Sequence, residues 1–240
     1  MNTLKDAVND PDLAERWQLA CLQLLERKKP AKAAATEKAR VLLHGLGRGR
    51  ALITSAIEWE QPSIGTNGQS ETDGMRGLLW RYVMAYTGWE LMAKSVLWDG
   101  GKPGALHPEP FEALLIGAPP LTPPFRSIET APKALQNWLT TDEEEEAHLP
   151  AFLGLSKNHR TFSCWLVGEP SGLSDLQVLA CMRHVVAHGT LSPTKTLQWG
   201  LKELYAKAPE LLEQLAERLT LTITPSDDLS TVEAAHTPLP

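Results

Sequence analysis

Cysteine is scarce in this sequence, and its few cysteines form no recognisable motif. Cys21, Cys164 and Cys181 are the only three in 240 residues, and they are widely separated. A disulfide framework uses an even number of cysteines, and a thiolate zinc site uses closely spaced ones. Neither is therefore expected here. The thiols are instead predicted to be free, in a reducing cytosol.

Long apolar runs, leader-like residues and strand patterns are also missing. No stretch approaches the ~18 apolar residues that a membrane span needs. The first residues, MNTLKDAVNDPDLAER, are polar and acidic, whereas a signal peptide has a basic start and an apolar run. The sequence has no alternation of apolar and polar residues of the kind that predicts strands, and it has no internal repeat. These absences predict a cytoplasmic protein without a membrane partner.

An overall excess of basic charge is absent as well, since the formal net charge is −6. The charge is unevenly distributed. Residues 27–50 hold eight Lys or Arg and a single acid, Glu37, whereas residues 142–146 are five consecutive acids. The basic stretch could attract phosphate, but a solvated helix face is the favoured interpretation because exposed Lys and Arg are common.

What the sequence does contain is helical periodicity. Apolar residues are 42% of the chain and recur at helical spacing in six segments. We expect a bend where Gly45, Gly47 and Gly49 weaken the second helix by roughly 1 kcal/mol each. The same glycines are not interpreted as a phosphate loop, because no strand precedes them and no Lys-Ser/Thr follows. The predicted helices cover about residues 11–28, 32–59, 75–98, 134–139, 174–188 and 196–221, and residues 152–167 are ambiguous.

The predicted fold class is therefore all-α, a bundle of about five main helices. One helical domain is expected over residues 1–224. It is interrupted by a Pro-rich insertion at 99–132, which holds eight of the 18 prolines, and by an acidic segment at 140–150. Residues 225–240 are polar and Pro-ended, which predicts a flexible tail.

Reactive side chains concentrate at 183–189, in the sequence RHVVAHG at the end of an apolar helix. Ser174 or Asp175 is expected to cap the start of that helix, and Gly189 occupies the position of a C-terminal glycine cap. At a helix C-terminus the carbonyls lack partners and the dipole favours a cation, so His188 is predicted to be protonated or to titrate near neutrality. Arg183 supplies a fork of donors that suits phosphate oxygens. Together they offer what metal-independent cleavage of an RNA phosphodiester needs.

Geometry restricts how these two groups can meet. Five residues on an ideal helix correspond to about 140° around its axis, so Arg183 and His188 of one chain cannot easily meet on a regular helix. Either the last turn unwinds at Gly189, or two copies of the segment meet across a two-fold axis. A two-fold interface would place two arginines and two histidines in one cleft.

The pattern Arg, polar residue, three residues, His, near a helix end and followed by Gly, resembles the signature of the HEPN family (higher eukaryotes and prokaryotes nucleotide-binding). Arg183, His184 and His188 match that signature, and Ala187-His188-Gly189 strengthens the local likeness. The Tyr86–Lys94 helix, the Leu-rich final helix and the helix order are also similar. The resemblance covers about residues 10–60, 74–99 and 172–222.

The resemblance implies a bundle of four to five helices, a homodimer with a composite cleft and a metal-independent endoribonuclease without cofactor. Arg183 and His188 would be catalytic, with His184 in support. Many members cut RNA as toxins or defence effectors, and their antitoxin partner is often a minimal nucleotidyltransferase. Other members are inactive, so a nucleotide-binding or adaptor module is the alternative function.

Each residue of the motif also has an ordinary structural interpretation. Arg183 could cap carbonyls or pair with Asp175, and His188 could simply cap a helix. His184 and His188 share one helix face and could hold a metal, but no third ligand lies nearby in sequence, so no metal site is predicted. Glu90 and Lys94 are expected to form an ordinary helix pair, with a role for Glu90 in holding Arg183 as the alternative. Cys181 is expected in the core rather than as a nucleophile.

Overall fold

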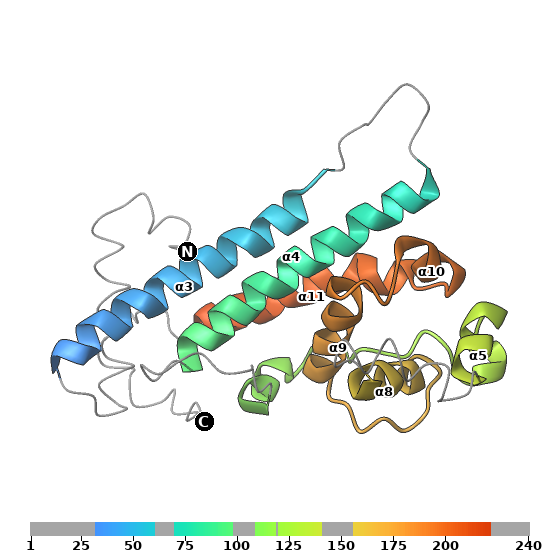
Figure 1. Cartoon of the computed structure of the whole chain (residues 1–240). Helices are drawn as coiled ribbons and strands as arrows, with labels where there is room; N and C mark the ends of the chain where they lie inside the picture. Colours follow the sequence, from blue (N-terminus) through green and yellow to red (C-terminus); the bar gives the residue numbers. More distant parts are fainter. Residues whose placement is uncertain (1–31, 61–69, 98–108, 119, 141–155, 222–240) are drawn as a thin grey trace. The chain divides into compact units, whose positions relative to one another are not determined.

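The computed structural model describes residues 32–60, 70–97, 109–118, 120–140 and 156–221, and in these ranges all regular structure is helical (Figure 1). The predicted all-α fold class is confirmed. The described residues fall into two compact units: those within 1–55, 87–116 and 212–240 form unit 1, and those within 56–86 and 117–211 form unit 2. The α-helices are α3 (Lys32–Glu58), α4 (Glu71–Leu97), α5 (Lys133–Thr140), α8 (Ser156–Leu166), α9 (Asp175–Ala187), α10 (Pro193–Gln198) and α11 (Lys202–Leu221), and the short 3₁₀ helices are η1 (Glu109–Leu115) and η2 (Ile128–Thr130).

Most of the predicted helices that fall within the described residues are confirmed. The segments at 32–59, 75–98 and 134–139 correspond to α3, α4 and α5. The ambiguous region 152–167 contains α8. The predicted helix at 11–28, the acidic run at 142–146 and the tail at 225–240 lie outside the described residues.

The single helix predicted over 196–221 is wrong, because two helices occupy this region. Ser192 caps the first of them, α10: its hydroxyl accepts from the Lys195 amide at 3.2 Å, and Pro193 is the first helical residue. The helix ends before Gly200, which has a φ of +66° that favours glycine. A Ser-Pro start and a glycine end were both visible in the sequence, although apolar periodicity alone runs through them.

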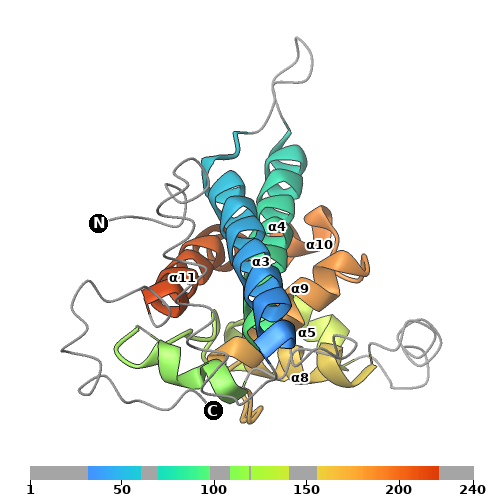
Figure 2. The same cartoon turned by 90° about the vertical axis from the view of Figure 1, so that its left-hand side faces the viewer.

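Gly45 and Gly49 of α3 form a seam with α4 in unit 1, and α3 runs through them as one continuous helix without a break. The two helices run antiparallel along this seam (Figure 2). A Cβ atom built on Gly49 would lie 2.5 Å from the Gly88 carbonyl oxygen, and one on Gly88 would lie 2.5 Å from the Gly49 carbonyl oxygen. A Cβ on Gly45 would overlap the Ser95 side chain. The glycines therefore permit close backbone approach, and the packing compensates for their low helix propensity.

Two arginines tie further segments of unit 1 together. Arg50 on α3 pairs with Glu213 at 3.5 Å and Glu217 at 3.1 Å on α11. Arg218 donates to the carbonyl oxygens of Leu114 at 2.6 Å and Ile116 at 3.0 Å, at the end of η1. The described part of the Pro-rich segment in unit 1 is thus held by charge-assisted hydrogen bonds.

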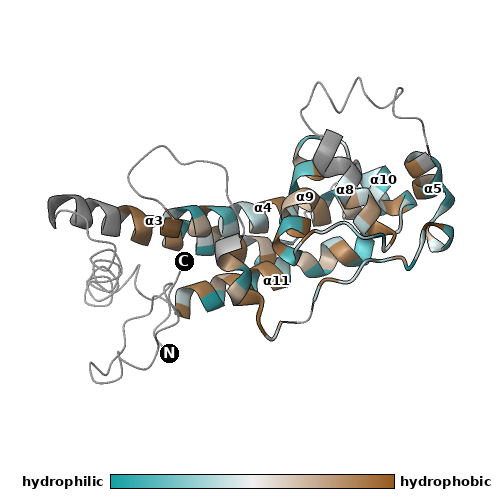
Figure 3. Ribbon diagram, turned by 90° about the horizontal axis from the view of Figure 1, so that it is seen from below, coloured by the Kyte–Doolittle hydropathy of each residue, from teal (hydrophilic) through white to brown (hydrophobic). Residues whose placement is uncertain are grey.

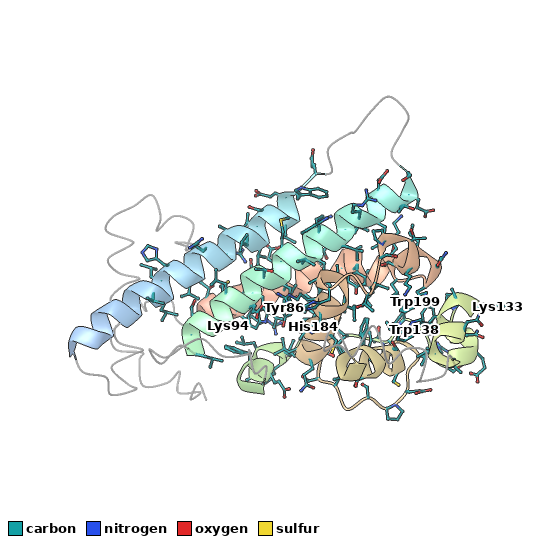
Figure 4. All side chains as sticks on the ribbon, viewed as in Figure 1. Tyr86, Lys94, Lys133, Trp138, His184 and Trp199 are labelled. Atoms are coloured by element: carbon teal, nitrogen blue, oxygen red, sulfur yellow. The ribbon has the colours of Figure 1, made fainter. Side chains whose placement is uncertain are left out.

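Unit 2 is built around α9. Its buried residues Leu176, Val178, Leu179, Met182 and Val185 cover more than one side of the helix, as expected for a helix with several neighbours. Helix α8 packs against it (Figure 1). Trp138 of α5 and Trp199, just after α10, lie 5.2 Å apart between ring centroids and are labelled in Figure 4.

The amphipathic helix α11 contributes to both units, and brown apolar and teal hydrophilic residues alternate along its ribbon (Figure 3). Its apolar residues Tyr205, Ala208, Leu212, Leu215 and Leu219 are buried. Among the described helices, none combines the length and the apolar character that crossing a membrane would require.

Candidate functional site

The start of α9 is closed by its own side chains. Ser174 is the N-cap: its hydroxyl accepts from the Gln177 amide at 3.4 Å, and the Gln177 side chain accepts from the Ser174 amide at 3.0 Å. This reciprocal pair is a capping box, and it shows that Ser174 is the cap of the two residues predicted for that role. Asp175 accepts from the Leu121 amide at 3.0 Å. Asp175 lies eight residues, or about 12 Å of helix, from Arg183, too far to pair with it along the helix.

The other end of α9 is closed by a glycine. The helix ends at Ala187, His188 is the cap residue, and Gly189 has a φ of +73°. The Gly189 amide donates to the Val186 carbonyl oxygen at 2.9 Å. The Leu191 amide donates to the Val185 carbonyl oxygen, also at 2.9 Å. The turn thus satisfies two end carbonyls with backbone amides, as predicted for a glycine in this position.

The structure brings the two histidines of the motif together. His184 and His188 differ by one helical turn, and their ring centroids lie 4.5 Å apart with planes inclined at 58°. His188 is exposed, whereas His184 (labelled in Figure 4) is half-buried. One imidazole is therefore open to a ligand, and the second lies directly beside it.

Arg183 has a different environment from the histidines. Its side chain is half-buried, and its Nε atom is buried. Burial raises the pKa of Tyr82, a residue of α4 in the same unit, and the positive charge of Arg183 opposes this shift to a small extent. The helix remains regular through Ala187, so Arg183 and His188 keep their angular offset of about 140° at the backbone.

Two tyrosines contact the backbone of α9, and no sequence signal pointed to either contact. The Tyr82 hydroxyl donates to the Leu179 carbonyl oxygen, and the Tyr205 hydroxyl donates to the Met182 carbonyl oxygen at 3.3 Å. Their rings meet edge to face, with centroids 5.2 Å apart. The sequence around each tyrosine cannot show that its hydroxyl reaches a neighbouring helix just before Arg183.

The remaining candidates have structural roles. Cys181 is buried, and burial raises the pKa of its thiol to about 11, so the thiol stays protonated near neutral pH. Lys94 and Glu90 form the predicted ion pair at 2.8 Å. Within the described ranges, no group of three or more His, Cys, Asp or Glu side chains is arranged to hold a metal ion.

Comparisons with known proteins yield no relative of this chain: no family model, no curated protein and no solved structure matches it. The chemistry must therefore be argued from the residues themselves. The end of α9 supplies an exposed imidazole, a second imidazole in contact with it, and a guanidinium one residue before the second. Such a set can exchange protons and bind an anion such as a phosphodiester.

Proposed function

We propose that the chain is a metal-independent endoribonuclease of HEPN type that cuts RNA with Arg183 and His188, supported by His184. The observation that carries the proposal is the pairing of His184 and His188 at 4.5 Å, with His188 exposed and Arg183 adjacent in sequence. These side chains are not needed to end α9, because the turn at Gly189 already provides partners for the last carbonyls.

The reaction uses the ribose 2′-hydroxyl as its nucleophile. His188 accepts the proton of this hydroxyl, the 2′-oxygen attacks phosphorus, and the bond from phosphorus to the 5′-oxygen breaks. The leaving 5′-oxygen takes a proton from a protonated imidazole. Arg183 stabilises the additional negative charge on the phosphorane-like transition state. The products are a 2′,3′-cyclic phosphate, which can open to a 3′-phosphate, and a 5′-hydroxyl.

A homodimer resolves the angular offset between Arg183 and His188. In a two-fold interface through the end of α9, Arg183 of one copy can face His188 of the other. Mixing the inactive variants Arg183→Ala and His188→Ala should then restore part of the cleavage, because mixed dimers regain one intact pair. A monomer with an intramolecular site would give no recovery on mixing.

The direct test is cleavage of structured and unstructured RNA by the full chain with a chelator present. Arg183→Ala and His188→Ala should each lower the cleavage rate by about 10²- to 10⁴-fold. Two matched controls are available on α3, His44→Ala and Arg48→Ala, because both residues are exposed and lie outside the motif. These controls should cut like the parent protein, and the product ends should be cyclic or 3′-phosphate and 5′-hydroxyl.

Two results would overturn the proposal. If both motif variants cut as fast as the parent, the site assignment is wrong. If the parent binds RNA or nucleotide saturably and never cuts, the chain is an inactive binding module instead.

The biological setting that this activity suggests is a cytoplasmic toxin or defence effector. Expressed alone, the chain should slow growth, and the motif variants should not. A minimal nucleotidyltransferase is the proposed antitoxin, and its co-expression should restore growth. Growth inhibition that persists in His188→Ala would show that any toxicity has another source.

A further inference from the structure

Tyr82 and Tyr205 hold α9 through two backbone carbonyls that lie immediately before the reactive segment. Tyr82 belongs to α4 and Tyr205 to α11, and both are fully buried within unit 2. Their hydroxyls donate to the carbonyl oxygens of Leu179 and Met182. Carbonyls three residues apart lie on one side of a helix, so both hydroxyls contact the same side of α9.

These hydrogen bonds are not needed to satisfy the helix. In a regular α-helix the Leu179 carbonyl already accepts from the Arg183 amide, and the Met182 carbonyl from the Val186 amide. Phenylalanine would fill the same space without a buried hydroxyl, which costs free energy to desolvate. The hydroxyls therefore contribute something that packing alone does not, namely a preferred rotation of α9 about its axis.

Rotation of α9 determines where the reactive side chains point. Successive residues are 100° apart, so a small turn of the helix would redirect Arg183 and His184 together. Burial also raises the pKa values of both phenols well above 10, which keeps them protonated as hydrogen-bond donors over the physiological range. The guanidinium of Arg183 lies near enough to Tyr82 to oppose this shift.

We infer that Tyr82 and Tyr205 are positioning residues, whose hydroxyls orient the α9 turn that carries Arg183 and His184. This inference rests on the proposed ribonuclease function for its catalytic consequence. Its structural part, the restraint of the turn, can be measured without any activity.

Tyr82→Phe and Tyr205→Phe remove the hydroxyls and keep the rings. We expect Tyr82→Phe to lower kcat about tenfold and Tyr205→Phe about threefold, with KM changed less than about twofold, because the loss is one of orientation rather than of RNA binding. The matched control is Ile53→Val, which trims a buried side chain of unit 1 and destabilises the core without altering α9. The control should leave kcat unchanged even if it lowers the melting temperature as much as Tyr82→Phe does. If it lowers kcat as much as Tyr82→Phe does, or if both phenylalanine variants match the parent kcat, the inference is wrong.

Hydrogen exchange separates this inference from the proposed function. In both variants the amides of Arg183 and Val186 should exchange faster than in the parent, while the amide of Val178, near the helix start, should not change. If the parent does not cut RNA but the two amides respond as expected, the ribonuclease proposal falls and the restraint stands. If the parent cuts RNA but neither phenylalanine variant changes kcat or amide exchange, only the proposed restraint of α9 is wrong. Should Tyr82→Phe fail to fold, Tyr205→Phe supplies the same measurements.

Discussion

The α3–α4 seam and the end of α9 both depend on glycine, but for opposite reasons. In the seam, Gly49 and Gly88 are helical residues that let two backbones approach, because any Cβ would collide with the facing carbonyl oxygen. At the end of α9, Gly189 has open space where a Cβ would lie and is required by its φ of +73° instead. A glycine can thus be required because a neighbouring helix packs closely against it, or because its own backbone is left-handed. Only the folded structure shows which of these two reasons applies.

The seam and the end of α9 also differ in their polar groups. In the seam, the Ser95 hydroxyl donates to the Leu91 carbonyl oxygen of its own helix at 2.7 Å. At the end of α9, two imidazoles lie together although backbone amides already close the turn. Packing explains the first region, whereas the proposed ribonuclease function would explain the second.

The largest expected effect on stability comes from Gly49→Ala. Its Cβ would lie 2.3 Å from the Met92 side chain and 2.5 Å from the Gly88 carbonyl oxygen, and the backbone oxygen cannot move without separating the helices. We expect a loss of about 2–3 kcal/mol in the free energy of unfolding. Urea titration of the parent and the variant measures it.

Gly47→Ala is the matched control in the same helix. Nothing lies within 4 Å of a Cβ built there, so alanine should stabilise the protein by about 0.5–1 kcal/mol through helix propensity. If both alanines shift stability in the same direction, the seam is not the reason for glycine at position 49.

The next effect is a loss of stability at alkaline pH that originates around α9. Burial raises the pKa of Cys181 from 9.0 to about 11 and those of Tyr82 and Tyr205 well above 10.0. The unfolded chain releases these protons first, so the folded state binds more protons and its stability falls as pH rises. The contribution of Cys181 to the free energy of unfolding is complete below pH 9 and is lost by about pH 11, and it is on the order of 3 kcal/mol.

Urea titrations from pH 7 to 11 would test this dependence. Tyr82→Phe should flatten the fall above pH 10 because it removes one of the titrating groups. The seam residues Gly45, Gly49, Gly88, Met92 and Ser95 have no titratable side chain in this range, so seam variants should keep the parent slope. An unchanged slope in Tyr82→Phe would contradict the assignment to α9.

Gly189→Ala is expected to have a smaller effect, of about 1 kcal/mol. Nothing lies within 4 Å of the added Cβ, so the cost is that of the left-handed backbone alone. Gly189→Asn should lose less, because asparagine tolerates this conformation. The contrast with Gly47→Ala is direct: both positions are open, and only the sign of φ differs. Thermal melting of the three variants measures the order, and a Gly189→Ala protein as stable as the parent would contradict it.

Much of α9 could be predicted because its signals are local. Ser174 with Gln177 at the start and Gly189 at the end are capping residues that act within one turn of the helix. The break between α10 and α11 had equally local signals in Ser192, Pro193 and Gly200, but apolar periodicity was given more weight. Local chemistry is therefore the more reliable guide where the two disagree.

The features that could not be predicted are those that depend on a partner distant in sequence. Gly45 and Gly49 indicate a bend by propensity, and only the facing α4 helix explains why α3 continues. The contact between the Tyr82 hydroxyl and the Leu179 carbonyl joins residues 97 positions apart. Neither segment alone predicts this hydrogen bond, because the bond depends on how α4 and α9 pack.

The smallest expected effect is that of Cys181→Ala on the proposed RNA cleavage. Cys181 lies two residues before Arg183, about 200° away around the helix axis, and is buried on the core side. A nucleophilic cysteine must form a thiolate, and with a pKa of about 11 roughly one thiol in a thousand would be ionised at pH 8. The variant should therefore cut RNA within about twofold of the parent rate while losing about 1 kcal/mol of stability from the small cavity. A folded Cys181→Ala protein that no longer cuts would mean that the thiol takes part in the reaction, and a mechanism built on Arg183 and His188 would then be incomplete.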